Sequence, residues 1–184
     1  MSPAAAAPQE DDPFHEAARD LRRTVGAEFR AEREAAEFEA DQLARRRASI
    51  ADVARQAAHR GDTVEVRVAG RAFHGLIAGV GEDHVWLTSE VGDVHLVAAA
   101  VSAWRTLPAT SAGVDATDPG SIRALLRGCE LDGRVVSVVL ADGVEIDGAV
   151  RTVARDHVIL ADSLGEVLVA MPQVVAVLER PGRR

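Results

Sequence analysis

The chain lacks three amino acids altogether: its 184 residues include no lysine, no asparagine and no tyrosine. All 21 basic residues are therefore arginine, and aromatic residues make up only 3% of the chain. The three missing residues have A/T-rich codons, so the bias indicates a G+C-rich bacterial genome. The use of arginine in place of lysine consequently carries little functional information here.

Cysteine and long hydrophobic runs are almost absent as well. Cys129 is the single cysteine, which excludes an intrachain disulfide and favours a reducing cytoplasm. The N-terminal Met-Ser-Pro-Ala-Ala-Ala-Ala-Pro has neither a basic region nor a long apolar run, so it is not a signal peptide. No stretch approaches the roughly 20 apolar residues of a membrane-spanning helix. We therefore expect a soluble cytoplasmic protein without a membrane partner.

Catalytic and phosphate-binding motifs are also missing. The sequence contains no Gly-x-Ser-x-Gly, phosphate loop, paired cysteine or His-Glu-x-x-His motif, so we expect neither an enzyme nor a cofactor. The formal charge is −8 and the pI about 5.2. An acidic chain is repelled by a phosphate backbone unless its basic groups cluster. Nucleic acid is thus disfavoured as a partner.

The most informative pattern is an internal repeat. Residues 70–106 and 143–179 align without a gap and share 11 of 37 positions. The shared residues are turn glycines, apolar positions and one polar pair rather than reactive groups. A repeat of this kind predicts two tandem structural units.

Before the repeat, the pattern predicts a helix. Residues 1–11 are rich in alanine, proline and acidic side chains, and we expect them to be disordered. Asp12-Pro13 is a helix-start signal, and apolar residues then recur at helical spacing through residues 12–47. The apolar stripe is thin, so this amphipathic, charged helix is expected to form a coiled coil, to pack on its own protein, or to lie in solvent.

Each unit of the repeat is expected to hold a short helix followed by five short strands. The first unit covers residues 48–107 and the second 118–180, with a turn-rich linker over 108–117. A capping box at Ser49 predicts a helix that stops at Gly61. In the second unit the pattern predicts a helix from Ser121 that ends at Gly128, and strands over 135–140, 144–152, 157–161, 167–170 and 174–178.

Five short strands can curl into a small barrel if glycines permit a sharp bend, and Gly75 and Gly148 are placed to do so. The second unit then reads Val136-x-Val138-x-Leu140-x-Asp142-Gly143, with Gly165 and a closing Val-Val-Ala-Val further on. These residues resemble the Sm-like family, which includes the bacterial Hfq-like proteins. The resemblance implies a mainly β fold: a long N-terminal helix followed by two tandem five-stranded Sm-like barrels.

The same resemblance implies rings that bind single-stranded RNA, but the residues that carry this function differ here. Where the family has a Tyr-Lys-His stretch before the last strand, this chain has Ala98–Ala100 and Met171–Gln173. Residues 61–106 contain six acidic side chains and three arginines, and residues 133–180 contain seven and four. Both units are thus net negative, which opposes phosphate binding.

Two polar pairs recur at the same place in each unit, Asp83-His84 and Asp156-His157. A carboxylate can orient an imidazole for acid–base or metal chemistry, but the same pair can simply cap a turn and open a strand. We favour the structural role for both pairs and expect no metal. His74 and His95 could join His84 as metal ligands only if adjacent strands align all three.

The densest basic cluster is Arg45, Arg46 and Arg47, at the end of the predicted long helix. These arginines could contact phosphate or an acidic partner, or stabilise the helix dipole and balance nearby glutamates. The sequence therefore predicts a non-catalytic protein-interaction, assembly or regulatory module that binds a protein partner or itself. The alternative is a degenerate Sm-like RNA-binding protein.

Overall fold

The computed structural model describes residue 29, residues 32–109 and residues 112–179. The chain divides into two compact units, Met1–Ala48 and Ser49–Arg184. The segment 1–11, expected to be disordered, lies outside the described residues. No helix in the described part of the chain combines the length and apolar composition needed to cross a bilayer.

The prediction of one long helix over residues 12–47 is wrong. Helical geometry is described only for residue 29 and residues 32–47, where the side chains are exposed. Alanine replaces large apolar side chains in this stretch, so little apolar surface is available to stabilise a long helix. Among the described residues the stretch buries no apolar stripe, and the expected coiled coil is wrong for the same reason.

Two short helices introduce the strands of the second compact unit. Helix α2 (Ile50–Arg60) begins with the predicted capping box between Ser49 and Asp52 and stops at Gly61, whose φ is 70°. Helix α3 (Ile122–Asp132) is capped by the Ser121 side chain. It continues through Gly128, contrary to expectation, because the next turn buries Cys129.

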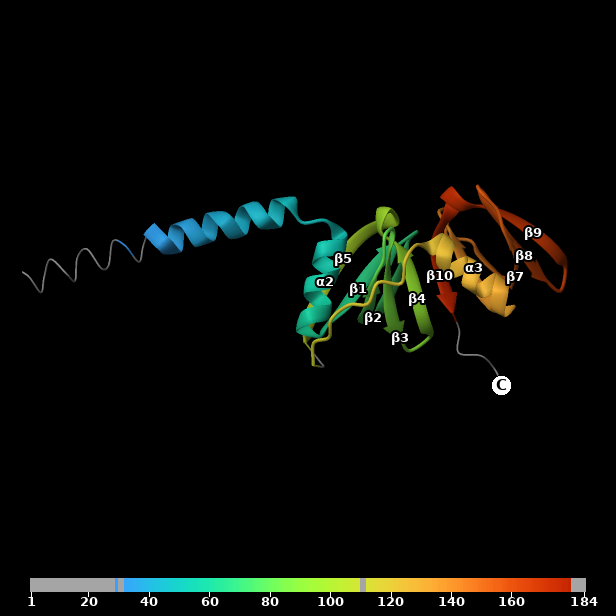
Figure 1. Cartoon of the computed structure of the whole chain (residues 1–184), viewed down its shortest axis with the longest axis horizontal. Helices are drawn as coiled ribbons and strands as arrows, with labels where there is room; N and C mark the ends of the chain where they lie inside the picture. The colour runs from blue at the N-terminus through green and yellow to red at the C-terminus, as the bar shows by residue number, and fades with distance from the viewer. Residues whose placement is uncertain (1–28, 30–31, 110–111, 180–184) are drawn as a thin grey trace, which may run out of the picture. The chain divides into compact units, whose positions relative to one another are not determined.

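Ten strands follow these helices, five after each (Figure 1). The predicted strands of the second half are confirmed to within one or two residues. A three-residue 3-10 helix precedes the last strand of each set: η1 (Ala98–Ala100) and η2 (Met171–Gln173). The strands are β1 Asp62–Val68, β2 Arg71–Val80, β3 His84–Ser89, β4 Gly92–Val97, β5 Val101–Ala109, β6 Val135–Leu140, β7 Glu145–Val153, β8 His157–Asp162, β9 Gly165–Ala170 and β10 Val174–Glu179.

All ten strands belong to one antiparallel sheet, in the order β5-β1-β2-β3-β4-β10-β6-β7-β8-β9. The predicted pair of five-stranded Sm-like barrels, and with it the tandem-barrel arrangement, is therefore wrong. Closing two barrels would require β4 to pair with β5 and β9 to pair with β10. Instead β10 pairs with β4, in a register that places Ala176 opposite Leu96 and Glu179 opposite Asp93. We call this β4–β10 pairing the junction.

The junction forms because β10 is apolar on both faces. Its residues 174–178 read Val-Val-Ala-Val-Leu, and all five are buried. Val175, Ala176 and Leu178 belong to the hydrophobic cluster built mainly by β1–β4 and α2. Val174 and Val177 belong to the second cluster, built by β6–β9 and α3. If β10 did not pair with β4, the side chains that it contributes to the first cluster would be exposed to water. Burial of this apolar surface therefore drives the pairing with β4.

Gly75, which the sequence predicts as the site of a sharp bend, lies in the middle of β2. It sits opposite Val64 of β1. A Cβ atom at this position would overlap the backbone carbonyl of Thr88 in β3, so the close approach of β2 and β3 requires glycine here. At Gly148 in β7 the equivalent contact is looser, with 3.0 Å to the carbonyl oxygen of Ala161.

We therefore expect Gly75→Ala to destabilise the fold more than Gly148→Ala. Overpacking against a fixed backbone group costs roughly 1–3 kcal/mol, and only the contact at Gly75 forces a strand to move. Chemical denaturation monitored by tryptophan fluorescence measures both losses. Equal losses, or a larger loss for Gly148→Ala, would contradict the close packing of β2 on β3.

Candidate functional site

The first polar pair, Asp83-His84, lies in the turn between β2 and β3. Asp83 Oδ1 accepts a hydrogen bond from the backbone N–H of Ile122 at 2.9 Å and lies 3.2 Å from Nδ1 of His84. The Asp83 carbonyl also accepts from the N–H of Ala98, at the start of η1. The pair thus fastens the turn to two other elements, α3 and η1.

The second pair, Asp156-His157, occupies the corresponding turn between β7 and β8. Asp156 Oδ1 lies 2.7 Å from Nδ1 of His157, and its carbonyl accepts from the N–H of Met171 in η2. The hydrogen bond with His157 lowers the pKa of Asp156. The second pair is more exposed than the first. The side chain of His84 is fully buried, whereas that of His157 is partly exposed and the Asp156 carboxylate is largely exposed. Both pairs make the contacts of turn residues.

The three histidines that could have formed a metal site do not come together as one. His84 and His95 are close, with ring centroids 5.2 Å apart, whereas His74 is exposed on β2, opposite Glu65 of β1. Within the described ranges, no group of three or more histidine, cysteine, aspartate or glutamate side chains could hold a metal ion.

The structure instead gathers a polar cluster at the junction, which we call the junction cluster: His84, Trp86, His95, Arg134 and Glu179. His95 is buried and stacks on Trp86, with ring centroids 5.6 Å apart. Its Nε2 lies 3.2 Å from Oε1 of Glu179 in β10. Oε2 of Glu179 accepts from the guanidinium of Arg134, which precedes β6.

Sequence reasoning missed this cluster because its members come from both halves of the chain. Trp86 and His95 face each other across the β3–β4 hairpin, which a strand-pairing argument could have found. Glu179 joins them only because β10 pairs with β4, and no local pattern signals that pairing. The side chain of Trp86 is partly buried.

Hydration and charge set the electrostatics of the junction cluster. Burial lowers the pKa of His84, and the hydrogen bond to Asp83 only partly opposes that shift. The hydrogen bond from His95 lowers the pKa of Glu179, with a further contribution from Arg134. Three buried atoms, Nε2 of His84, Nδ1 of His95 and Nε1 of Trp86, have no hydrogen-bond partner among the described residues. The cluster therefore combines a buried His84 ring, whose charged form is disfavoured, with the Glu179 carboxylate, whose charged form is favoured.

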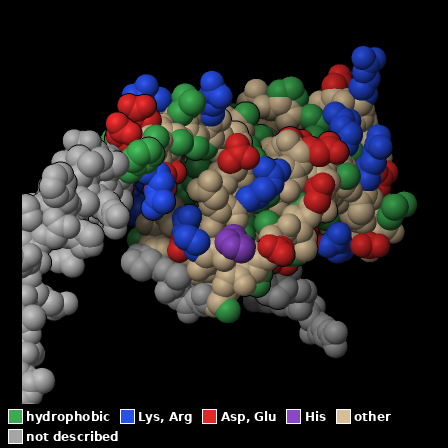
Figure 2. All heavy atoms as spheres, turned by 60° about the vertical axis from the view of Figure 1, so that its left-hand side comes forward, with side chains coloured by type: hydrophobic (Ala, Val, Ile, Leu, Met, Phe, Trp, Pro, Cys, Tyr) green, Lys and Arg blue, Asp and Glu red, His purple; other side chains and the backbone are tan. Residues whose placement is uncertain are grey.

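The basic cluster Arg45, Arg46 and Arg47 lies at the end of the helical stretch 32–47, and all three side chains are exposed. Arg45 and Arg46 line a shallow pocket of about 330 Å³ together with Phe38, Asp41 and Gln42. An acidic side chain thus sits among the arginines. In the other compact unit, the face seen in Figure 2 intersperses acidic and basic side chains rather than gathering one sign.

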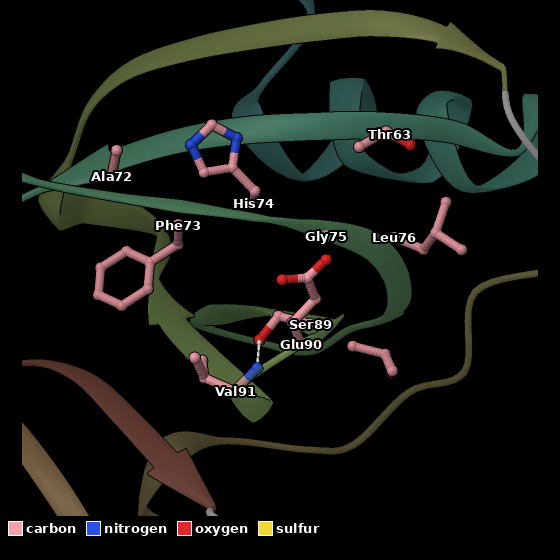
Figure 3. A pocket seen from close by; sticks show the side chains of 10 residues that line it. Thr63, Ala72, Phe73, His74, Gly75, Leu76, Ser89, Glu90 and Val91 are labelled. Carbon is pink, nitrogen blue, oxygen red and sulfur yellow. Dashed lines mark hydrogen bonds between the residues drawn. The ribbon is translucent and has the colours of Figure 1, made fainter.

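A pocket of about 620 Å³ lies along β2 and the β3–β4 turn (Figure 3). Its lining is mainly apolar, with the imidazole of His74 and the carboxylate of Glu90 as its titratable groups. The turn is held by the Ser89 hydroxyl, which accepts from the N–H of Val91 at 3.3 Å. Among the described residues no hydrogen bond or ion pair joins His74 to Glu90, so the pocket does not present an assembled acid–base pair.

Two strongly exposed apolar side chains lie at one end of the sheet. Strand β9 pairs with β8 on one side and has no neighbouring strand on the other within the described residues. Leu168 in β9 is 62% exposed, and Leu164 in the preceding turn is 95% exposed. At the opposite end of the sheet, β5 pairs only with β1.

Comparison with known proteins adds no assignment. No protein-family model matches the sequence, and no curated protein is detectably similar to it. The Sm-like resemblance thus has no support from family comparison.

The burial of His84 predicts that acid weakens the fold. Because its pKa is lowered in the folded chain, the unfolded chain binds the proton first, and stability falls as pH drops below the ordinary value of about 6.5. Asp83, Asp118 and His95 face this ring, and the two carboxylates soften the effect. Urea unfolding between pH 7.5 and 5 should give a shallower pH dependence for His84→Gln. His74→Gln, whose exposed ring loses little hydration on folding, should keep the wild-type slope, and equal slopes in all three proteins would refute the effect.

Glu179 is expected to stabilise the junction by linking His95 to Arg134. Glu179→Gln should lower the free energy of unfolding by up to about 2 kcal/mol, since it weakens hydrogen bonds to a charged group. Glu90→Gln, at an exposed turn, is the matched control and should change stability by less than about 0.5 kcal/mol. Denaturant titration at pH 7.5 compares them. No difference between the two variants would mean that the Glu179 contacts do not stabilise the junction.

Proposed function

We propose that this chain is a non-catalytic assembly module that binds another protein chain through a free edge of its sheet. The observation that carries the proposal is β9: an edge strand with exposed apolar side chains. Val167 and Leu168 lie 36% and 62% exposed on it, next to the exposed Leu164. Exposed apolar edges of this kind are typical of surfaces that another chain covers.

The backbone of β9 supports the same proposal. A strand at the end of a sheet presents alternate N–H and C=O groups that a further strand can satisfy. Edge strands that avoid such pairing usually carry proline, inward charges or a bulge. The pairing of β9 with β8 runs without a register shift, and the strand contains no proline. Its one charged side chain is Glu166.

The titratable groups of the second compact unit favour a non-catalytic role. The two Asp-His pairs are engaged in turn contacts, and both histidines of the junction cluster are buried. A reacting centre needs a nucleophile or a general base that a substrate can reach. His74 and Glu90 are accessible but make no described contact with each other.

RNA binding is the alternative, and it would have to use Arg45, Arg46 and Arg47. Electrostatic binding to RNA is strongest at low salt. Filter retention of RNA by the full chain at about 50 mM salt, lost in a triple Arg→Ser variant at these positions, would favour the alternative. No described contact of Arg45, Arg46 or Arg47 favours RNA binding over protein binding.

The proposal is tested by site-specific photo-crosslinking in the native cells. A photoreactive amino acid at position 168, in β9, should give one light-dependent adduct of defined mass, identified by mass spectrometry. The same group at position 131, an 87% exposed leucine on α3, is the matched control and should give none. No adduct at 168, or the same adducts from both positions, would overturn the proposed function.

A further inference from the structure

We infer that the partner of β9 is strand β5 of a second copy of this chain, in a head-to-tail arrangement. This inference rests on the proposed function and names its partner. It is drawn from the junction, where the chain already pairs two strands of the same two kinds with each other.

The two strands of the junction have the same local settings as the two free edges. Strand β4 follows β3 after a tight turn and leads into η1, and β9 follows β8 and leads into η2 in the same way. Strand β10 follows η2 and pairs with β6, just as β5 follows η1 and pairs with β1. The junction joins β4 to β10. The strands left over, β9 and β5, are therefore one edge of each kind.

Burial shows what pairing does to such strands. In β4, Val94 and His95 are buried under β10. In β9, the side chains at the corresponding positions are Val167 and Leu168, which are exposed. Similarly Leu178 of β10 is buried, whereas Arg105 at the corresponding position of β5 is exposed. Pairing β9 with β5 would cover Val167 and Leu168 as β10 covers β4, which is favourable because apolar area leaves water.

The junction also fixes the expected register. It places Ala176, Val177, Leu178 and Glu179 opposite Leu96, His95, Val94 and Asp93. A shift of 73 residues carries these pairs onto the free edges. The expected intermolecular pairs are Ala103 with Val169, Trp104 with Leu168, Arg105 with Val167, and Thr106 with Glu166.

These pairs are chemically compatible. Leu168 would lie against Trp104, whose ring is already partly buried on the first hydrophobic cluster. Arg105 can lay its aliphatic stem along Val167 while its guanidinium stays in water. Thr106 carries a hydroxyl that can donate to the Glu166 carboxylate. No like charges face each other, which would have opposed the pairing.

The pairing uses different surfaces on the two copies, so each dimer leaves one β9 and one β5 free. Such a heterologous contact continues until it closes into a ring or runs on as a filament. Light scattering of the full chain should therefore give a mass above the 19.5 kDa of one chain, rising with concentration. Leu168→Arg should reduce it to one chain, and Leu131→Arg, with an equally drastic change on exposed α3, should leave it unchanged.

Disulfide trapping tests the register independently. Arg105→Cys on one chain and Val167→Cys on another, tagged chain place the thiols directly opposite, within reach of a bond. Arg105→Cys with Leu168→Cys is the matched control, because neighbouring residues of a strand point to opposite faces. The first mixture should form a tagged heterodimer on mild oxidation, and the second should form several-fold less. Cys129 is buried and stays in every variant.

Failure of the inference and failure of the proposed function give different results. A chain that is monomeric at about 100 μM, or an oligomer that Leu168→Arg leaves intact, overturns pairing with a second copy. If the photo-crosslink at position 168 then contains a different protein, the assembly function stands with another partner. If that position gives no adduct, both fail. Equal trapping by the two cysteine mixtures overturns the register and with it the assigned β9–β5 pairing.

Discussion

The pairing of β10 with β4 is the constraint on which the rest of the structure depends. Without it, the ten strands would form two separate groups of five, and β4 and β10 would each become an unpaired edge strand. The run Val174–Leu178 is apolar on both faces, and it satisfies both only when it lies between β4 and β6. One sheet of ten strands, rather than two closed barrels, is the consequence.

The junction cluster follows from the same constraint. A carboxylate is costly to bury unless it is paired and hydrogen-bonded, and Glu179 becomes tolerable because His95 and Arg134 contact it from opposite sides of the junction. The contacts reach from β4, through the end of β10, to the residue that precedes β6. The polar groups thus mark the correct partner for β10, since a slip of one residue would turn Glu179 to the other face of the sheet.

Local patterns predicted local structure well and long-range structure badly. Ser49, Asp52 and Gly61 specify α2 through side-chain and backbone contacts within a few residues, so the sequence suffices there. Gly128 misled because burial of Cys129 one residue later outweighs the low helix propensity of glycine. The strands of the second half were found from alternation and turns. Their partners were not, because pairing between β4 and β10 joins residues about 80 positions apart in the chain and leaves no periodic signal.

The error about barrels and the missed cluster have one origin. A pair of barrels requires each group of five strands to pair within itself, so that no strand of either group is left at an edge. Because β4 pairs with β10, the strands form one open sheet. Such a sheet has two edge strands, and here they are β5 and β9. Because the internal contact consumes one edge of each kind, the two that remain are complementary to each other but cannot meet within one chain, at opposite ends of a ten-stranded sheet. The arrangement that joins the halves thus leaves every copy with an unsatisfied edge of each kind. Among the described residues, no further strand pairs with either edge, so both keep backbone groups that an additional strand could pair with.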